Sequence, residues 1–241
     1  MRITTLVFLF AFWAEFSGFG QIVQNPVSGS GALSSPVKSY KAATAFSQNL
    51  YNGRIYYWYD YRSEEHQFYK DSEWHMGQVF YDGQQHDSIP LKYDVFKDQL
   101  LIRHLNGDHM ILQTPKISWF SIDDHRFQYL TKEGGLPAGM ISSFYDQVFI
   151  GKTSFLVLRK KDRQEKIVDK KVVSFYPVKD RYYLLIDGIY REVRSKKSVR
   201  SLFPGQERIL RKALREAQIP FRQNREAAIL LMVQHSEQVA L

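Results

Sequence analysis

Cysteine is absent from the 241-residue chain. Disulfide bonds, thiolate nucleophiles and cysteine-ligated zinc sites are therefore excluded, and with them the cysteine hydrolases and the zinc-finger proteins. A chain without cysteine is also compatible with export, because an oxidising compartment cannot trap it in wrong disulfide bonds.

Long apolar runs and catalytic motifs are also lacking. The apolar run Leu6–Ala14 has only nine residues, whereas a membrane-spanning helix needs about 20, so we expect no integral membrane protein. No Gly-x-Ser-x-Gly nucleophile elbow occurs. Gly151-Lys152-Thr153 has the form of the end of a phosphate-binding loop, but Asp146 stands where that loop needs its first glycine. No cofactor is therefore predicted.

The N-terminus has the pattern of a secretory signal peptide. Arg2 precedes the apolar run Leu6–Ala14, and Gly18 and Gly20 are small residues of the kind that signal peptidase reads. We place the signal peptide at residues 1–20, with cleavage after Gly20, and expect export to the periplasm, the cell envelope or the medium. Nucleic acid is then not an expected partner.

Residues 21–50 form a linker and lead-in segment rich in serine, glycine and proline. Residues 51–195 are predicted to form an antiparallel β domain, because short runs rich in β-branched and aromatic residues alternate with turn signals such as Asp82-Gly83 and Asn106-Gly107. The expected strands are 54–61, 78–81, 84–91, 99–105, 108–114, 116–122, 125–131, 142–150, 153–160, 172–176, 181–186 and 189–194. This number of short strands favours an antiparallel sheet or a partly open barrel.

The apolar period changes from two to about 3.6 residues in the C-terminal segment, residues 196–241. Pro204 suits the first turn of one helix, and Asn224 is a good N-cap for a second. We therefore predict two C-terminal amphipathic helices that pack on the sheet, since helices this short are marginal alone. The predicted fold class is α+β, mainly β.

Charge is distributed unevenly along the chain. Residues 21–150 hold 11 basic and 14 acidic residues, and residues 151–241 hold 21 basic and 10 acidic ones. On the first predicted helix, helical spacing gathers four cations into one stripe, formed by Arg208, Arg211, Lys212 and Arg215. Such a stripe suits anionic lipid headgroups or an acidic envelope polymer. A plain solvated helix face is the competing interpretation.

The strand 54–61 reads RIYYWYDY and is unusually aromatic. Alternation places Tyr57, Tyr59 and Tyr61 on one face and Tyr56 and Trp58 on the other. One face is expected to enter the core, and the other offers stacking surface for a sugar or an apolar ligand. Ordinary strand packing of both faces is the alternative.

Six of the seven histidines lie between His66 and His125. If Asn106-Gly107 is a two-residue turn, His104 faces His109 across the hairpin, and the two imidazoles form a candidate metal site. Such a site needs one or two further ligands from elsewhere in the fold. An exposed hairpin end that carries histidine by chance is the alternative.

Several motifs follow one another in an order that resembles a known family. They are Tyr81-Asp82-Gly83, Ile89-Pro90-Leu91-Lys92-Tyr93-Asp94, Asp98-Gln99-Leu100-Leu101 and Gly151-Lys152-Thr153 with Arg159-Lys160-Lys161. From about Tyr51 to the C-terminus the chain resembles a family of uncharacterised secreted β-rich envelope proteins of Gram-negative bacteria. The resemblance implies a location in the cell envelope and implies no activity.

Together these features predict a secreted, non-enzymatic envelope protein that binds a lipid, a glycan or another envelope protein. The alternative is a hydrolase of an envelope polymer that uses paired carboxylates or a histidine-based metal. Its candidate carboxylates lie in two stretches, Glu64, Glu65, Asp71 and Glu73, and Asp94 with Asp98. Glycoside hydrolysis requires a defined separation between two carboxylates in space, which a sequence does not give.

Overall fold

The computed structural model describes residues 49–57, 63 and 65–239. These residues lie in one compact unit, Phe46–Leu241. The predicted signal peptide, residues 1–20, and nearly all of the linker segment 21–50 lie outside the described residues, as do residues 58–62 of the aromatic segment.

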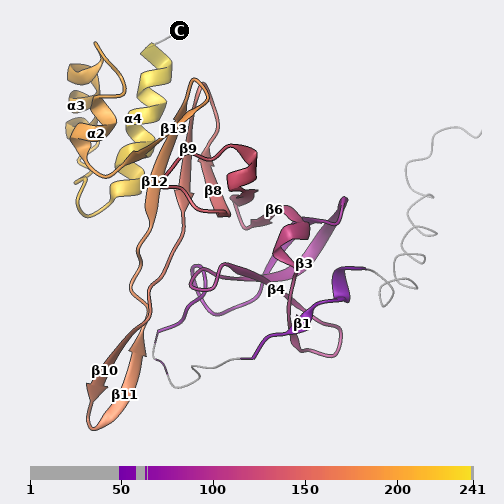
Figure 1. Ribbon diagram of the computed structural model, residues 1–241. Coiled ribbons are helices and arrows are strands. Elements are labelled where there is room, and N and C mark those ends of the chain that lie inside the picture. The colour runs from indigo at the N-terminus through magenta and orange to yellow at the C-terminus, as the bar shows by residue number, and fades with distance from the viewer. Residues whose placement is uncertain (1–48, 58–62, 64, 240–241) are drawn as a thin grey trace, which may run out of the picture. The chain divides into compact units, whose positions relative to one another are not determined.

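A large antiparallel sheet is the main element of this unit (Figure 1). Its strands are β1 (Arg54–Ile55), β2 (His75–Tyr81), β3 (Gln84–Asp94), β4 (Gln99–Arg103), β5 (His109–Ile111), β6 (Ile117–Ile122), β7 (His125–Leu130), β8 (Ser143–Phe149), β9 (Thr153–Leu158), β12 (Arg181–Ile186) and β13 (Ile189–Val193). The order of these eleven strands is β1-β5-β4-β3-β2-β6-β7-β8-β9-β12-β13, and the sheet is not closed. The prediction of a mainly β chain with an antiparallel sheet is confirmed.

Two of the predicted turn signals form the expected two-residue hairpin turns. Asp82-Gly83 has φ angles of 51° and 81°, and Asp187-Gly188 has φ angles of 50° and 75°. Two consecutive positive φ angles are what the type I′ turn requires, and aspartate and glycine tolerate them. These turns connect β2 to β3 and β12 to β13.

The turn at Asn106-Gly107 differs from the prediction. Arg103 lies opposite His109, and the N–H of Gly107 donates to the carbonyl of His104 over 2.9 Å. The loop therefore has three residues, and only Gly107 among them has a positive φ. Compared with the predicted two-residue loop, a three-residue loop shifts the strand register by one residue. Every side chain beyond the loop then projects from the opposite face of the sheet.

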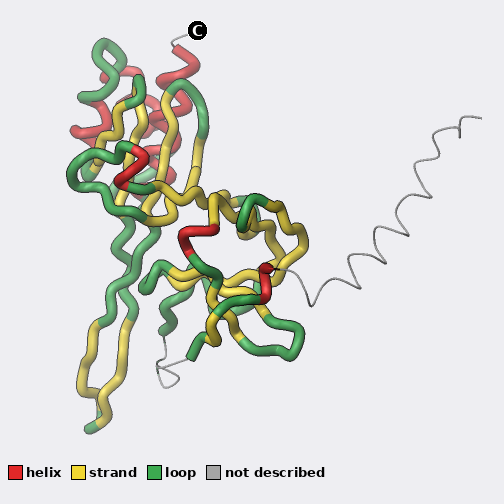
Figure 2. Tube along the Cα trace, turned by 45° about the vertical axis from the view of Figure 1, so that its right-hand side comes forward, coloured by secondary structure: helices red, strands yellow, loops and turns green. Residues whose placement is uncertain are grey.

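A second, two-stranded sheet consists of β10 (Gln164–Val168) and β11 (Lys171–Phe175). Asp169 and Lys170 form its turn with φ angles of 49° and 62°. The hairpin continues the β9–β12 pair beyond the main sheet, through an isolated bridge between Lys161 and Val178 (Figure 2). Strand β10 was not predicted, because its residues are mostly polar and carry no alternating apolar face.

Three α-helices follow the sheet in the described part of the chain: α2 (Lys196–Arg200), α3 (Glu207–Glu216) and α4 (Arg225–Val239). As predicted, the Asn224 side chain caps α4, because its Oδ1 accepts the N–H of Ala227 over 3.1 Å. Helix α3 begins at Glu207, so Pro204 lies in the preceding turn and not in the first helical turn. Helix α2 has five residues, too few for a periodic pattern to reveal. Single 3-10 turns occur at Asn49–Tyr51, Thr114–Lys116 and Lys132–Gly134.

The helices pack on one face of β9, β12 and β13. On that face Phe155, Val157 and Leu184 form one buried cluster with Leu210 of α3 and Met232 of α4. Side chains on the other face of the same strands form a separate cluster, made of Leu156, Leu158 and Tyr183 with Met140 and Tyr145. Strand alternation thus gives β9 two buried faces. This packing fixes the orientation of α3 relative to these strands.

The first half of the sheet has its own aromatic core. Tyr93, Phe120, Phe127 and Phe144 are fully buried and contact one another, with centroid distances of 4.7 to 5.8 Å. Most of these contacts are edge-to-face, the arrangement that aromatic quadrupoles favour. These four aromatic side chains therefore serve packing.

Candidate functional site

The predicted tyrosine face is described only at Tyr57. Tyr59 and Tyr61 lie outside the described residues, and β1 ends at Ile55, well before the predicted strand end. Tyr57 is 77% exposed and Tyr56 is buried. The hydroxyl of Tyr56 donates to Asp94 Oδ2 over 2.7 Å, so this side of the segment is fastened to the core.

The candidate carboxylates Asp94 and Asp98 hold the turn between β3 and β4. Asp94 Oδ1 accepts the N–H groups of Phe96 and Lys97 over 3.0 and 2.9 Å. Asp98 accepts the hydroxyl of Tyr93 over 2.6 Å. Burial raises the pKa of both carboxyl groups. Their hydrogen bonds show a structural role in the turn.

His104 and His109 do not face each other, so the predicted pairing is wrong. Arg103 is the residue opposite His109. His104 contacts the ring of Tyr51 at 5.6 Å, whereas His109 contacts Trp74 at 4.7 Å. The three-residue turn is the physical reason, because it shifts the register by one position. Within residues 49–57, 63 and 65–239, no group of three or more His, Asp or Glu side chains is placed to hold a metal ion.

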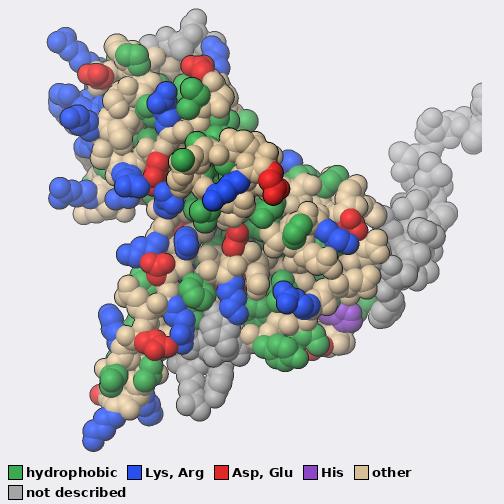
Figure 3. Space-filling view, in the orientation of Figure 1, with side chains coloured by type: hydrophobic (Ala, Val, Ile, Leu, Met, Phe, Trp, Pro, Cys, Tyr) green, Lys and Arg blue, Asp and Glu red, His purple; other side chains and the backbone are tan. Residues whose placement is uncertain are grey.

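The four predicted cations of α3 are all exposed, and they belong to a larger basic surface. We define this basic surface by its exposed cations on α2, on α3 and at the start of α4: Lys196, Lys197, Arg208, Arg211, Lys212, Arg215, Arg222 and Arg225. Figure 3 shows lysine and arginine side chains gathered over the helices in this orientation. The excess of positive charge after residue 150 was the sequence signal for this surface, but it did not identify the α2 and α4 residues.

Most cations of the basic surface form no ion pair with the acidic residues that the structure describes. Lys212 lies 3.6 Å from Glu216, and both side chains are largely exposed. Arg225 lies over the ring of Tyr182 at 5.8 Å. The other six form no ion pair with any residue that the structure describes. The positive charge of this surface is therefore not neutralised within the described unit.

A concave region borders the basic surface. A pocket of about 560 Å³ is lined by Arg194, Lys196, Arg222 and Arg225 beside Pro220 and Phe221. Arg194 and Arg225 also line a second pocket of about 360 Å³. Because four cations converge on the larger pocket, it is suited to an anionic group.

Glu192 lines one side of the smaller pocket. It accepts hydrogen bonds from Arg181 Nε over 3.1 Å and from Arg194 Nη2 over 2.8 Å. These bonds from two guanidinium groups lower the pKa of the Glu192 carboxyl to about 2. Glu192 therefore stays ionised and holds Arg194 near the pocket.

Glu192 is expected to stabilise the fold in a pH-dependent way. A carboxyl whose folded pKa is lowered contributes stability above its unfolded pKa of 4.5 and loses that contribution as the pH falls to about 2. We expect Glu192→Gln to lower the free energy of unfolding by about 1 kcal/mol at neutral pH, since partial solvation weakens such pairs. Urea titrations should show the difference between wild type and variant vanishing toward pH 2; a constant difference would contradict this assignment.

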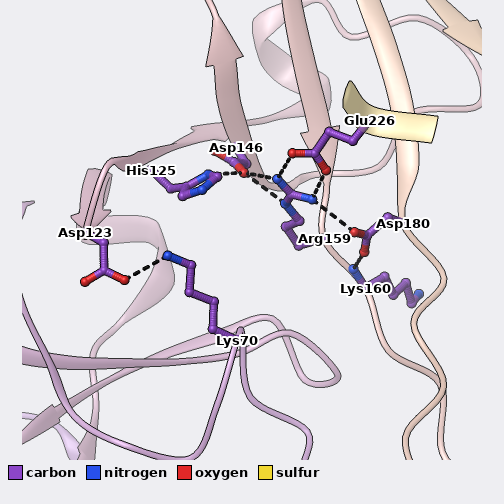
Figure 4. Close-up of polar contacts among 8 residues, drawn as sticks. All are labelled: Lys70, Asp123, His125, Asp146, Arg159, Lys160, Asp180 and Glu226. Carbon is purple, nitrogen blue, oxygen red and sulfur yellow. Dashed lines mark hydrogen bonds and ion pairs between the residues drawn. The ribbon is translucent and has the colours of Figure 1, made fainter. Parts of the chain in front are cut away.

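A buried ion network centred on Arg159 joins α4 to the sheet (Figure 4). Arg159 Nε lies 2.9 Å from Asp146 Oδ2, and Nη1 lies 3.2 Å from Asp180 Oδ2. Glu226 of α4 receives both terminal nitrogens of the guanidinium, one of them over 2.9 Å. His125 Nδ1 lies 2.8 Å from the same oxygen of Asp146. The network therefore connects β7, β8, the ends of β9 and β12, and α4.

The electrostatics of this network favour a structural role. Burial disfavours the charge of Arg159, but hydrogen bonds to Glu226 and the charges of Asp146 and Glu226 hold its pKa above the usual value. Burial raises the pKa of Asp180. Each of the three carboxylates bonds to the guanidinium, so the network holds all three in place. Sequence reasoning missed this network, because its members lie far apart in the chain and share no motif.

Comparison with protein-family models, curated proteins and solved structures gives no match to the chain. No helix of the described residues has the length and apolarity needed to cross a membrane. What the protein does must therefore be inferred from its own geometry, and the basic surface is the most distinctive feature of that geometry.

Proposed function

We propose that the chain is a non-enzymatic cell-envelope protein that binds phosphate or carboxylate groups of an anionic envelope component through the basic surface. The observation that supports this function is the basic surface itself, whose exposed cations, apart from Lys212, form no ion pair with any described residue. The predicted signal peptide supports the location. The described carboxylates converge in two places. Around Arg159 they bond to a guanidinium. Around His75, Asp71 and Asp123 lie 2.9 and 3.3 Å from the two ring nitrogens, and both carboxylates are largely exposed, outside any enclosed site.

The chemistry of the cations suits repeated anionic groups. Five of the eight are arginines, whose planar guanidinium binds carboxylate or phosphate through two parallel hydrogen bonds. Arg208, Arg211 and Arg215 follow one another along one side of α3, about 5 to 6 Å apart. Helix α3 is held in place by its buried residues Leu210, Ala213 and Leu214. A rigid row of this kind can engage several anionic groups at once.

The test is a triple variant, Arg208→Gln, Arg211→Gln and Arg215→Gln, made in the 241-residue chain. We expect its affinity for an anionic surface to fall about 100-fold, since each cation near such a surface contributes about 1 kcal/mol. Binding is measured in two arms, to phosphatidylglycerol vesicles by co-sedimentation and to soluble polyphosphate by calorimetry. The arm that responds identifies the source of the anionic group.

A matched control carries the same change of charge elsewhere. Arg54, Arg103 and Arg126 are exposed and lie on the sheet, so replacing them with glutamine removes three positive charges outside the basic surface. The control should lose less than about tenfold, through the general field alone. Equal losses in both triple variants, or no binding in either arm, would overturn the proposed function.

A further inference from the structure

The tip of the β10–β11 hairpin exposes aliphatic side chains. Ile167 is 79% exposed, Val172 is 64% exposed and Val168 is 44% exposed. A two-stranded hairpin has little core of its own and usually keeps apolar residues where another element covers them. No other element of the described unit covers these three side chains. An exposed apolar patch of this kind is typical of a contact site for another molecule.

The aliphatic side chains project from both faces of the hairpin. Ile167 lies opposite Val172, and these two share one face. Val168 lies opposite Lys171, one position along, and so projects from the other face. A groove in a partner protein, or the face of a second copy, would cover one side only. A fluid interface into which the tip dips covers both.

Lysines surround the aliphatic tip. Lys166, Lys170 and Lys171 lie within five positions of one another, and Asp169 is the single acidic residue among them. Long lysine side chains bury their methylenes beside apolar groups and extend the ammonium outward to anionic headgroups. The combination of aliphatic and cationic residues is complementary to an anionic lipid surface.

The base of the hairpin is fixed to the rest of the unit. The N–H of Tyr176 donates to Glu65 over 2.5 Å. Lys161 Nζ donates to the carbonyl of His66 over 2.7 Å, and Ser63 donates to the carbonyl of Ser174. A tip held at its base enters an interface with less entropic cost than a free loop.

We infer that the tip of the β10–β11 hairpin inserts into the headgroup region of an anionic lipid bilayer. Insertion stays shallow, because the outer edges of both strands carry unpaired backbone groups that the hydrocarbon core does not tolerate. This membrane-contact site lies on a different element from the basic surface and does not depend on the function proposed for that surface.

A single reporter tests the inference, and the lack of cysteine makes it simple to place. Val168→Cys in the complete sequence is labelled with an environment-sensitive fluorophore and mixed with vesicles of equal parts phosphatidylglycerol and phosphatidylcholine. We expect a blue shift of its emission and quenching by lipids that carry a quencher near the headgroup. Ile150→Cys, at an exposed turn in the main sheet, should show neither.

Affinity gives a second readout. The double variant Ile167→Asn and Val172→Asn should bind these vesicles at least about tenfold more weakly, because two aliphatic side chains no longer leave water. Ile150→Asn with Ile189→Asn is the matched control, since both residues are exposed isoleucines of the main sheet, and it should bind like the wild type. Unchanged thermal unfolding confirms that both variants fold.

Three outcomes would overturn the inference. Vesicle binding without a spectral change at position 168 would show that the hairpin tip does not contact the lipid and that the basic surface does. A blue shift that grows with protein concentration in the absence of vesicles would identify a second copy as the partner. Absence of vesicle binding would also end it, whereas polyphosphate binding would still support the function proposed for the basic surface.

Discussion

Replacing Arg159 with methionine is expected to lower the free energy of unfolding by about 3–5 kcal/mol. Among the described residues, Arg159 is the one lysine or arginine side chain that bonds to all of Asp146, Asp180 and Glu226, and Asp146 is completely buried. Without the guanidinium, Asp146 keeps only its contact with His125 within the described unit, and Asp180 only the Lys160 N–H. The three carboxylates then lose the cation between them and repel one another in a region of low dielectric constant. Urea denaturation followed by circular dichroism measures the loss.

The loss from Arg159→Met should depend on pH in a defined direction. Unpaired buried carboxyls have folded pKa values above their unfolded ones, so the folded state binds more protons and its stability falls as the pH rises. The variant should therefore recover part of its stability between about pH 7 and pH 5. Lys212→Met is the control, because its ion pair with Glu216 is largely exposed and should contribute less than about 1 kcal/mol. A loss as small as that in both variants would show that Arg159 does not fasten α4.

Replacing Gly77 with alanine should destabilise the sheet by more than about 3 kcal/mol or prevent folding. A Cβ atom at this position would lie 2.0 Å from the carbonyl oxygen of Ser121 and 2.8 Å from Leu91 Cδ1. Gly77 lies in β2, between β3 and β6, so neither neighbour can withdraw without breaking a strand pairing. Thermal unfolding and the yield of soluble protein measure the effect.

Gly134→Ala is the matched control for Gly77→Ala. Its nearest neighbour would be the Thr131 hydroxyl at 3.4 Å, an ordinary contact, and its φ is not positive. The change should be within about 1 kcal/mol of zero, since alanine also reduces the entropy of the unfolded chain. Similar stability of the two variants would show that β2 and β6 can separate at Gly77 without cost.

Local chemistry made the hairpins predictable. The Asp82-Gly83 and Asp187-Gly188 turns follow from the φ angles that aspartate and glycine tolerate, and they fix the register of two strand pairs. Asn106-Gly107 carries an equally strong signal, yet it forms part of a three-residue loop. The same dipeptide is compatible with both loop lengths, and the tertiary contacts of the flanking strands decide between them.

The basic surface and the Arg159 network were only partly predictable, because their residues meet through the fold. The stripe on α3 has helical spacing, so the sequence placed Arg208, Arg211 and Arg215 together. Arg222 and Arg225 line one pocket with Lys196 only because the fold brings the start of α4 beside α2. The Arg159 network depends on contacts over 13 to 67 positions, for which single-sequence patterns carry no signal.

The strand order also bears on how the chain folds. From β2 to β9, most neighbours in the sheet are neighbours in the sequence, so most pairings form by closing a short loop. The β2–β6 pairing is different, since Gly77 lies opposite Ile122, which is 45 positions later. Closing that loop has the larger entropic cost and joins two groups of hairpins that can each form earlier. The β1–β5 pairing spans more of the chain, since Arg54 lies opposite Ile111, but it only adds an edge strand. Between β2 and β9 we therefore expect assembly to be slowest at the β2–β6 seam, where Gly77 permits the two backbones to meet.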